Sequence, residues 1–139
     1  MLSSACDFDI NMHNIMNLII DAASEKVFLK IIISKDSYTN EYSNTKKNFD
    51  KIGLIIFDFL KTNNFKFNDI SNIFVNVGPG KFSSIRSSIA TCKAICMSHS
   101  INLYGFSSNQ IDGNDYKKLL DLSKKGVLMK DLINPIYSG

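Results

Sequence analysis

The chain has no tryptophan, only two prolines and only three cysteines among its 139 residues. An odd cysteine count without a secretory apolar leader argues against a disulfide framework and favours a reducing, cytoplasmic setting. Cys92 and Cys96 are one helical turn apart, a spacing that fits either a two-point metal site or a buried stripe. Because histidine is almost as scarce, with His13 and His99 alone, we expect core thiols and no metal site. The apolar run Ile52–Leu60 is too short to span a membrane.

Length and charge exclude further classes of protein. A chain of this length buries one real core, so one domain is expected. The net charge of +3 and a pI near 8.7 fall short of the strong basicity of a dedicated nucleic-acid binder. Lysines cluster near the end of the chain, where we interpret them as a solvated helix face, at positions 117, 118, 124, 125 and 130.

The pattern of apolar residues predicts an α/β fold. We expect strands at 18–21, 27–33, 37–43, 73–77 and 102–106 and helices at 45–62, 82–98 and 114–124. Three strands, helix, strand, helix, strand is the order of the ribonuclease H-like half-domain from which actin-like ATPases are built. The sequence therefore predicts a mixed sheet of about five strands with helices packed on it.

Two of the expected helices have faces suited to a partner. In the helix at 45–62 the apolar side chains cover an arc of roughly 200°, more than packing on one sheet requires, so its excess should meet another helix. The helix at 82–98 carries small residues opposite its apolar stripe, which would let a neighbouring backbone come close. The predicted partner interface consists of Ile52, Ile55, Phe57, Phe59, Ser84, Ser87, Ser88 and Thr91.

A glycine-rich turn joins the strand at 73–77 to the helix at 82–98. In such a turn, backbone N–H groups at the helix N-terminus can accept an anion or a partner's backbone. A P-loop would need glycine and serine or threonine where Val75 and Phe82 stand. The dinucleotide motif G-x-G-x-x-G fails at Ser83. Neither of these phosphate-binding motifs is therefore present.

This turn carries a family resemblance. The run G-P-G-K-F-S-S-I-R at Gly78–Arg86 resembles the G-[RP]-G-P-G-S-F-T-G-[LV]-R signature of the bacterial TsaB (YeaZ) proteins. Leu18–Ser24 is similar to that family's first strand and Asp-Thr-Ser turn, although Ala22 replaces the threonine and Ser84 replaces a signature glycine. TsaB proteins are non-catalytic members of the actin-like ATPase superfamily that support the TsaD enzyme in making threonylcarbamoyladenosine beside the anticodon of certain tRNAs.

The resemblance covers residues 16–108 and implies roles for particular residues. The signature loop corresponds to Gly78, Pro79, Gly80, Lys81, Phe82 and Arg86. Asp21 stands where the resemblance would place the phosphate-binding side of a degenerate nucleotide site. Residues 16–108 would form the TsaB-like lobe and residues 109–139 a reduced C-terminal segment, whose end at 134–137 is similar to the family's Pro-x-Tyr tail. We expect residues 1–15 to be a disordered extension.

The implied function is that of a non-catalytic scaffold. Its partner would be a TsaD-like catalytic subunit, with a TsaE-like ATPase as a further partner and a homodimer when alone. ATP and metal would belong to the partner subunit, and tRNA would be contacted only indirectly.

Two other functions stay open as alternatives. One is a degenerate actin-like nucleotide-binding domain. The other is a ribonuclease H-like nuclease, which would hold two metal ions with three or four carboxylates. Such a nuclease places one of these carboxylates on the first strand, where Asp21 stands, and one on the first helix, where Asp58 lies late in the expected helix. Asn76 stands where a further carboxylate is needed.

Overall fold

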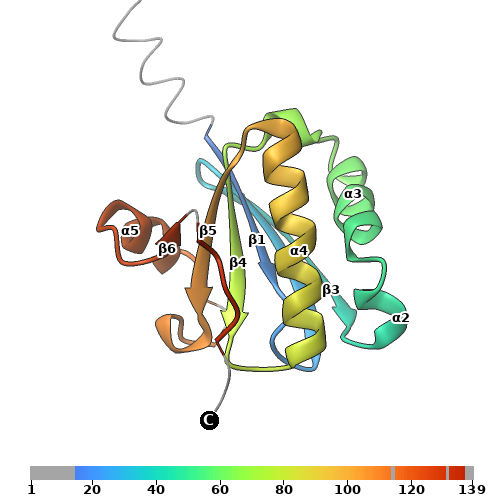
Figure 1. Cartoon of the computed structure of the whole chain (residues 1–139). Coiled ribbons are helices and arrows are strands. Elements are labelled where there is room, and N and C mark those ends of the chain that lie inside the picture. Colours follow the sequence, from blue (N-terminus) through green and yellow to red (C-terminus); the bar gives the residue numbers. More distant parts are fainter. Residues whose placement is uncertain (1–14, 114, 131, 137–139) are drawn as a thin grey trace, which may run out of the picture.

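One mixed sheet organises the part of the chain that the computed structural model describes, which comprises residues 15–113, 115–130 and 132–136. Its six strands run in the order β3-β2-β1-β4-β5-β6 (Figure 1). They are β1 (Met16–Asp21), β2 (Lys26–Ile33), β3 (Asp36–Ser43), β4 (Asn72–Gly78), β5 (Asn102–Ser107) and β6 (Met129–Lys130). The expected N-terminal extension lies outside the described residues, apart from Ile15.

The strand pairing places the functional positions at one edge of the sheet. β1, β2 and β3 form the expected antiparallel meander, whereas β1 pairs with β4 and β4 with β5 in parallel. Parallel neighbours end at the same edge of a sheet. The last residue of β1, Asp21, is therefore brought beside Asn76 near the end of β4, and their side chains are hydrogen-bonded.

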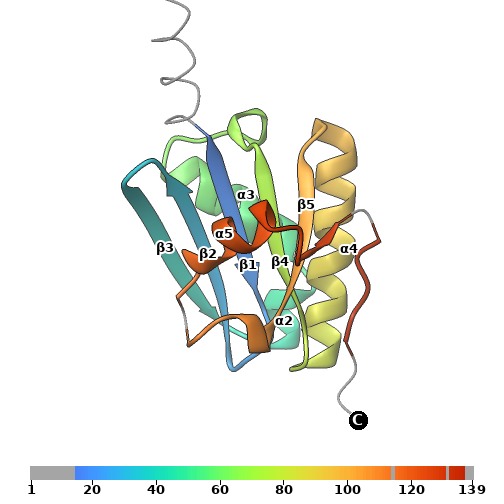
Figure 2. The same ribbon diagram turned by 90° about the vertical axis from the view of Figure 1, so that its left-hand side faces the viewer.

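Helices cover both faces of the sheet. α2 (Lys46–Phe49), α3 (Ile52–Thr62) and α4 (Phe82–His99) lie on one face, and α5 (Lys118–Lys124) lies on the other (Figures 1 and 2). Short 3₁₀ turns, η1 (Phe67–Asp69) and η2 (Ser108–Gln110), precede β4 and follow β5. None of the helices within the described ranges is long and apolar enough to cross a membrane.

The single helix expected at 45–62 is wrong, because the chain turns between α2 and α3. Lys51, with φ −121° and ψ 34°, leaves the helical region, and α2 and α3 then each pack against α4. The end of this segment is as predicted, since α3 stops at Thr62 and Asn63 follows as its cap.

The two sides of the sheet bury separate cores. Alternate residues of a strand point to opposite faces, so Leu18 and Ile20 pack with α3 and α4 while Ile19 packs with α5. Cys92 and Cys96 belong to the first core, as predicted. Burial raises the pKa of both thiols, that of Cys96 to about 11, and so keeps them protonated at neutral pH.

The C-terminal part of the chain was predicted least well. The helix expected at 114–124 starts only at Lys118, and Asn114 lies outside the described residues. β6 was not predicted, because its two residues are too few to show an alternating pattern. Both elements pack on the sheet formed by the preceding residues, β6 by pairing with β5 and α5 through Leu119.

Candidate functional site

A cleft opens at the edge of the sheet where β1 and β4 end. Its volume is about 390 Å³, and it is lined by Asp21, Ala23, Ser24, Asn76, Pro79, Ser108, Ile111 and Gly113. The strand register brings the first and fourth strands here, and the loop after β5 closes the cleft with Ser108. This is the place where the sequence predicts a degenerate phosphate side.

Asp21 is held inside this cleft by donors of its own chain. The Tyr116 hydroxyl donates to Oδ2 at 2.7 Å, and Asn76 Nδ2 donates to Oδ1 at 2.9 Å. The backbone N–H of Ala23 adds a longer bond of 3.3 Å to Oδ1. Only 6% of the surface of Asp21 is exposed. Both carboxylate oxygens therefore have partners without any ligand.

The residues of this cleft do not fit a two-metal centre. Asp21 is the one carboxylate among the lining residues, whereas such a centre needs several. Asp58 is exposed on α3 and does not line the cleft. Throughout residues 15–113, 115–130 and 132–136, no three His, Cys, Asp or Glu side chains come together as a metal site.

Tyr116 is the residue that the sequence did not identify. It is separated from Asp21 by 95 positions, and it follows the predicted lobe boundary. Burial, then the negative charge of Asp21 and the hydrogen bond to it, raise the pKa of Tyr116 far above its ordinary value. The phenol thus stays protonated and continues to donate to Asp21.

Replacing Tyr116 with phenylalanine should destabilise the protein by about 1.5–3 kcal/mol at neutral pH, since a buried carboxylate loses a donor. A raised pKa favours folding below the ordinary tyrosine value of about 10, and this contribution is lost as pH rises above it. Above pH 10 the free energy of unfolding should therefore fall less steeply for the variant than for the parent. The two slopes should differ by up to about 1.4 kcal/mol per pH unit. Urea unfolding of both proteins at several pH values measures this difference, and parallel curves would contradict the assignment.

The signature loop is fixed by close backbone contacts. The Lys81 N–H donates to the Ala23 carbonyl at 2.8 Å, so this amide is not directed at a ligand. A Cβ at Gly80 would lie 2.3 Å from the same carbonyl oxygen. Gly78 has φ +111°, and a Cβ there would lie 2.8 Å from the Ile136 carbonyl oxygen. Both glycines are therefore structural requirements, Gly78 for its conformation and Gly80 for lack of space.

The side chains of Lys81, Phe82 and Arg86 in this loop are exposed at the surface. Lys81 is exposed and its Nζ lies 3.2 Å from Glu25. The Arg86 guanidinium stands 5.2 Å from the centre of the Phe82 ring, a cation–π contact between exposed residues.

The Gly80→Val variant should be destabilised by roughly 1–3 kcal/mol, because either the loop or the β1–β2 turn must shift to admit the side chain. Gly53→Ala is the control for a glycine change, since Gly53 lies within a helix and a Cβ there would make only an ordinary contact of 3.4 Å with Thr91 Cγ2. Thermal unfolding compares the two variants with the parent. A Gly80→Val protein as stable as the parent would show that the loop tolerates movement.

Most of the predicted partner interface is buried within the chain, which corrects the prediction. Ile52, Ile55 and Phe59 belong to the core between α3 and the sheet. Ser84 and Ser88 are also buried. The excess apolar arc and the small residues serve mainly to pack α3 and α4 against each other and against the sheet.

The contacts of the small residues explain this outcome. Ser84 Oγ donates to the Ala22 carbonyl at 2.8 Å, and Ser88 Oγ donates to the Ile85 carbonyl at 2.9 Å. A Cβ at Gly53 would lie 3.4 Å from Thr91 Cγ2, so α3 and α4 approach closely at this point. The helix that packs closely against α4 is therefore α3 of the same chain.

Asn44 is a second residue that the sequence did not single out. Its Nδ2 lies within hydrogen-bond distance of the Ala22 carbonyl, the Ser24 carbonyl and Ser84 Oγ, at 2.8, 2.6 and 3.0 Å. It thereby ties the turn after β1 to the first turn of α4.

Of the predicted interface, Phe57, Ser87 and Thr91 remain fully or partly exposed, and Leu54 lies beside them as an exposed residue that was not predicted. Leu54 and Phe57 on α3 are 58% and 48% exposed. They lie beside the contact of Gly53 with Thr91, which Ala90 and Ala94 flank on α4. We name this surface the α3–α4 outer face; it consists of Leu54, Phe57, Ser87, Ala90, Thr91 and Ala94.

The antiparallel meander, the parallel strands after it and the helices on both faces define a ribonuclease H-like half-domain of the actin-like ATPase type. The family model described as "TsaD: tRNA N6-adenosine threonylcarbamoyltransferase" matches residues 27–112, more than half of the 139 residues. The chain therefore belongs to the TsaD family. Among curated proteins, no sequence matches it significantly.

Solved structures share the fold at low sequence identity. YeaZ from Pseudomonas aeruginosa is 12% identical and superposes with a TM-score of 0.64 over 81% of this chain and 50% of its own. A protein described as similar to peptidase YeaZ from P. aeruginosa is 14% identical, with a TM-score of 0.61 over 67% of this chain and 43% of its own. The chain thus spans half or less of these relatives, and its fold is TsaB-like.

A third solved structure also shares the fold. RuvC of Thermus thermophilus, solved with a Holliday junction substrate, is 8% identical, with a TM-score of 0.54 over 84% of this chain and 99% of its own. This likeness extends to the architecture alone.

Proposed function

We propose that this protein is a non-catalytic scaffold that binds a TsaD-like enzyme and supports its threonylcarbamoyladenosine modification of tRNA. The observation that carries the proposal is the α3–α4 outer face, where two large apolar side chains stand exposed beside small ones. Membership of the TsaD family supplies the chemistry in which such a subunit would take part.

The outer face has the properties of a helix-packing surface. Leu54 and Phe57 are three residues apart on α3 and so lie on one ridge. The small side chains of Ala90 and Ala94 leave a shallow strip on α4 into which a partner's ridge fits. Exposed apolar groups of this kind, grouped together, mark interaction sites on soluble proteins.

The cleft supports a role without catalysis. Both oxygens of Asp21 are hydrogen-bonded, to Tyr116 and to Asn76, and among the described residues no further carboxylate lines the cleft. In this proposal ATP and the metal ion belong to the TsaD-like subunit, and tRNA is met only through the complex. A TsaE-like ATPase is a further partner, and two copies of the chain pair through the same face when the enzyme is absent.

The alternatives are less well supported. A ribonuclease H-like nuclease would need a carboxylate near Asp21 where Asn76 donates a hydrogen bond instead. A degenerate nucleotide-binding domain would leave the cleft open to phosphate, yet the Lys81 amide in the loop is already bonded to Ala23.

Reconstitution tests the proposal. The pure chain, the TsaD-like protein of its host and both together are incubated with tRNA, ATP, bicarbonate and radiolabelled threonine. Every reaction also contains the TsaE-like ATPase and the enzyme that activates the carbamoyl group. We expect label in tRNA with both proteins, little with the TsaD-like protein alone and none with this chain alone. Equal labelling with and without the chain would refute the scaffold role.

A further inference from the structure

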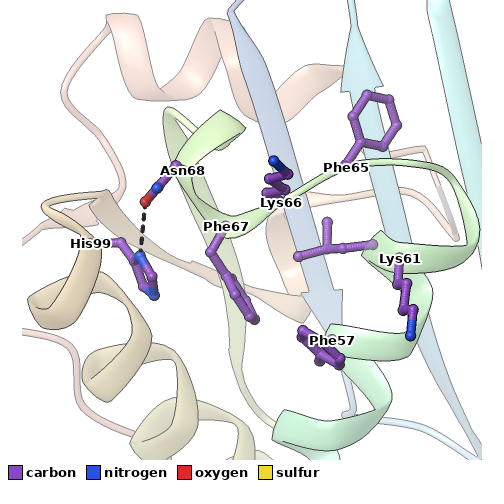
Figure 3. A pocket seen from close by; sticks show the side chains of 8 residues that line it. Phe57, Lys61, Phe65, Lys66, Phe67, Asn68 and His99 are labelled. Carbon is purple, nitrogen blue, oxygen red and sulfur yellow. Dashed lines mark hydrogen bonds between the residues drawn. The ribbon is translucent and has the colours of Figure 1, made fainter.

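A second hollow lies on the helical side of the molecule, away from the cleft of Asp21. It opens between the end of α3, the turn η1 and the end of α4 (Figure 3). Its volume is about 310 Å³. We name it the aromatic pocket; it is lined by Phe57, Leu60, Lys61, Phe65, Lys66, Phe67, Asn68 and His99.

Three rings of this pocket stand in a row. The centres of Phe57 and Phe67 are 6.3 Å apart with 27° between their planes, and those of Phe67 and His99 are 5.2 Å apart with 23° between theirs. Asn68 Oδ1 lies 3.1 Å from His99 Nδ1 and orients the imidazole at the end of the row (Figure 3). The row ends at Phe57, which is almost half exposed and offers a flat aromatic surface to a ligand.

The rim of the pocket is positively charged. Lys61 and Lys66 are both exposed, and neither is in an ion pair with another of the described residues. The carboxylates nearest to them in the sequence are Asp58 and Asp69, which do not line the pocket and form no ion pair with either lysine. Asp69 Oδ2 instead accepts the Lys66 backbone N–H at 2.8 Å.

We propose that the aromatic pocket binds a nucleotide, with the base against the rings and the phosphate beside Lys61 and Lys66. Bases stack on aromatic side chains because every base has a π-face, and lysines bind phosphate through charge. The pocket volume is at the lower end for small-ligand sites, which suits one nucleotide. A neutral peptide with an aromatic side chain would also meet the rings but would leave the charges of the two lysines unpaired, and an acidic peptide is the competing ligand that the experiment includes.

The nucleotide can be free or can be an unpaired residue of a single-stranded RNA. Binding is measured with AMP by chemical-shift titration and with a fluorescein-labelled single-stranded RNA decamer by anisotropy. Ribose 5-phosphate and adenosine are the matched probes that lack the base and the charge. We expect saturable binding of AMP, of the decamer or of both, with each partial probe at least about tenfold weaker.

Two variants locate the site. Lys66→Glu reverses a rim charge, and Phe67→Leu removes a ring while keeping apolar bulk; both leave the outer-face residue Phe57 in place. Each should weaken binding by about tenfold. Lys47→Glu on α2, an exposed lysine that does not line the pocket, is the matched control and should weaken binding much less. Circular dichroism confirms that each variant is folded.

The outcomes separate the sources and decide the proposal. AMP binding that depends on Lys66 and Phe67 supports a free nucleotide, and decamer binding with the same dependence supports an RNA strand. The proposal is overturned if neither probe binds saturably, if ribose 5-phosphate binds as well as AMP, or if Lys47→Glu weakens binding as much as Lys66→Glu. It is equally overturned if an acidic, phenylalanine-containing peptide saturates the pocket while both nucleotide probes do not.

Discussion

Ser88→Arg is expected to remove a large part of the protein's stability. Ser88 is fully buried, and its hydroxyl is bonded to the Ile85 carbonyl at the face of α4 that packs inward. An arginine there would be an unpaired charge in a packed core, which we expect to cost more than about 4 kcal/mol. A domain has only about 5–15 kcal/mol of stability to lose. Circular dichroism and thermal unfolding measure the result.

Ser87→Arg is the matched control one position earlier. Ser87 is only partly buried and belongs to the α3–α4 outer face, so this variant should fold with a melting temperature close to that of the parent. The assignment of the inward and outward faces of α4 would be contradicted if the two variants were equally stable, or if Ser87→Arg were the less stable of the two.

Leu54→Asp is expected to abolish most of the association with a TsaD-like subunit while leaving the chain folded. Leu54 is exposed, so the change costs little in the free protein. In a helix-packed interface an aspartate would be a desolvated charge facing apolar groups, and replacing a hot-spot residue at the centre of an interface costs at least about 2 kcal/mol. The dissociation constant should therefore rise by about thirtyfold or more.

Val127→Asp provides the control for an apolar-to-acidic change. Val127 is 54% exposed, almost as much as Leu54, but it follows α5 and is not part of the outer face. Sedimentation of each variant with the TsaD-like protein measures the two affinities. Equal affinities for Leu54→Asp and Val127→Asp would place the interface elsewhere or remove it.

The strands and the main helix could be predicted from the sequence because their patterns are local. Short apolar runs marked β1 and β2, and the glycine pair with proline marked the turn before α4. The break between α2 and α3 could not be predicted from the local sequence, because it depends on how each of the two helices packs against α4. Lys51 leaves the helical region without proline, and Gly53 faces Thr91 inside the helix pair.

The site could be predicted only in part, for a different reason. The sequence placed Asp21 at the end of β1 and gave Asn76 its position on β4, and the two side chains do meet. The Tyr116 hydroxyl donates a hydrogen bond to the other carboxylate oxygen of Asp21 although the two residues are 95 positions apart. No local sequence pattern predicts such a long-range contact. The small residues of α4 predicted close packing against another helix, but they did not distinguish a helix of the same chain from a helix of a partner. Ser84 and Ser88 turned out to face the inside of the same chain.

Hydroxyl-radical footprinting of the chain with and without the TsaD-like subunit tests the central claim most directly. Leu54 and Phe57 are exposed probes on the outer face, and Val127 and Leu132 are exposed probes outside it. The scaffold account predicts that the partner lowers the oxidation of Leu54 and Phe57 and leaves that of Val127 and Leu132 unchanged. Unchanged oxidation at all four residues, or protection confined to Val127 and Leu132, would contradict it.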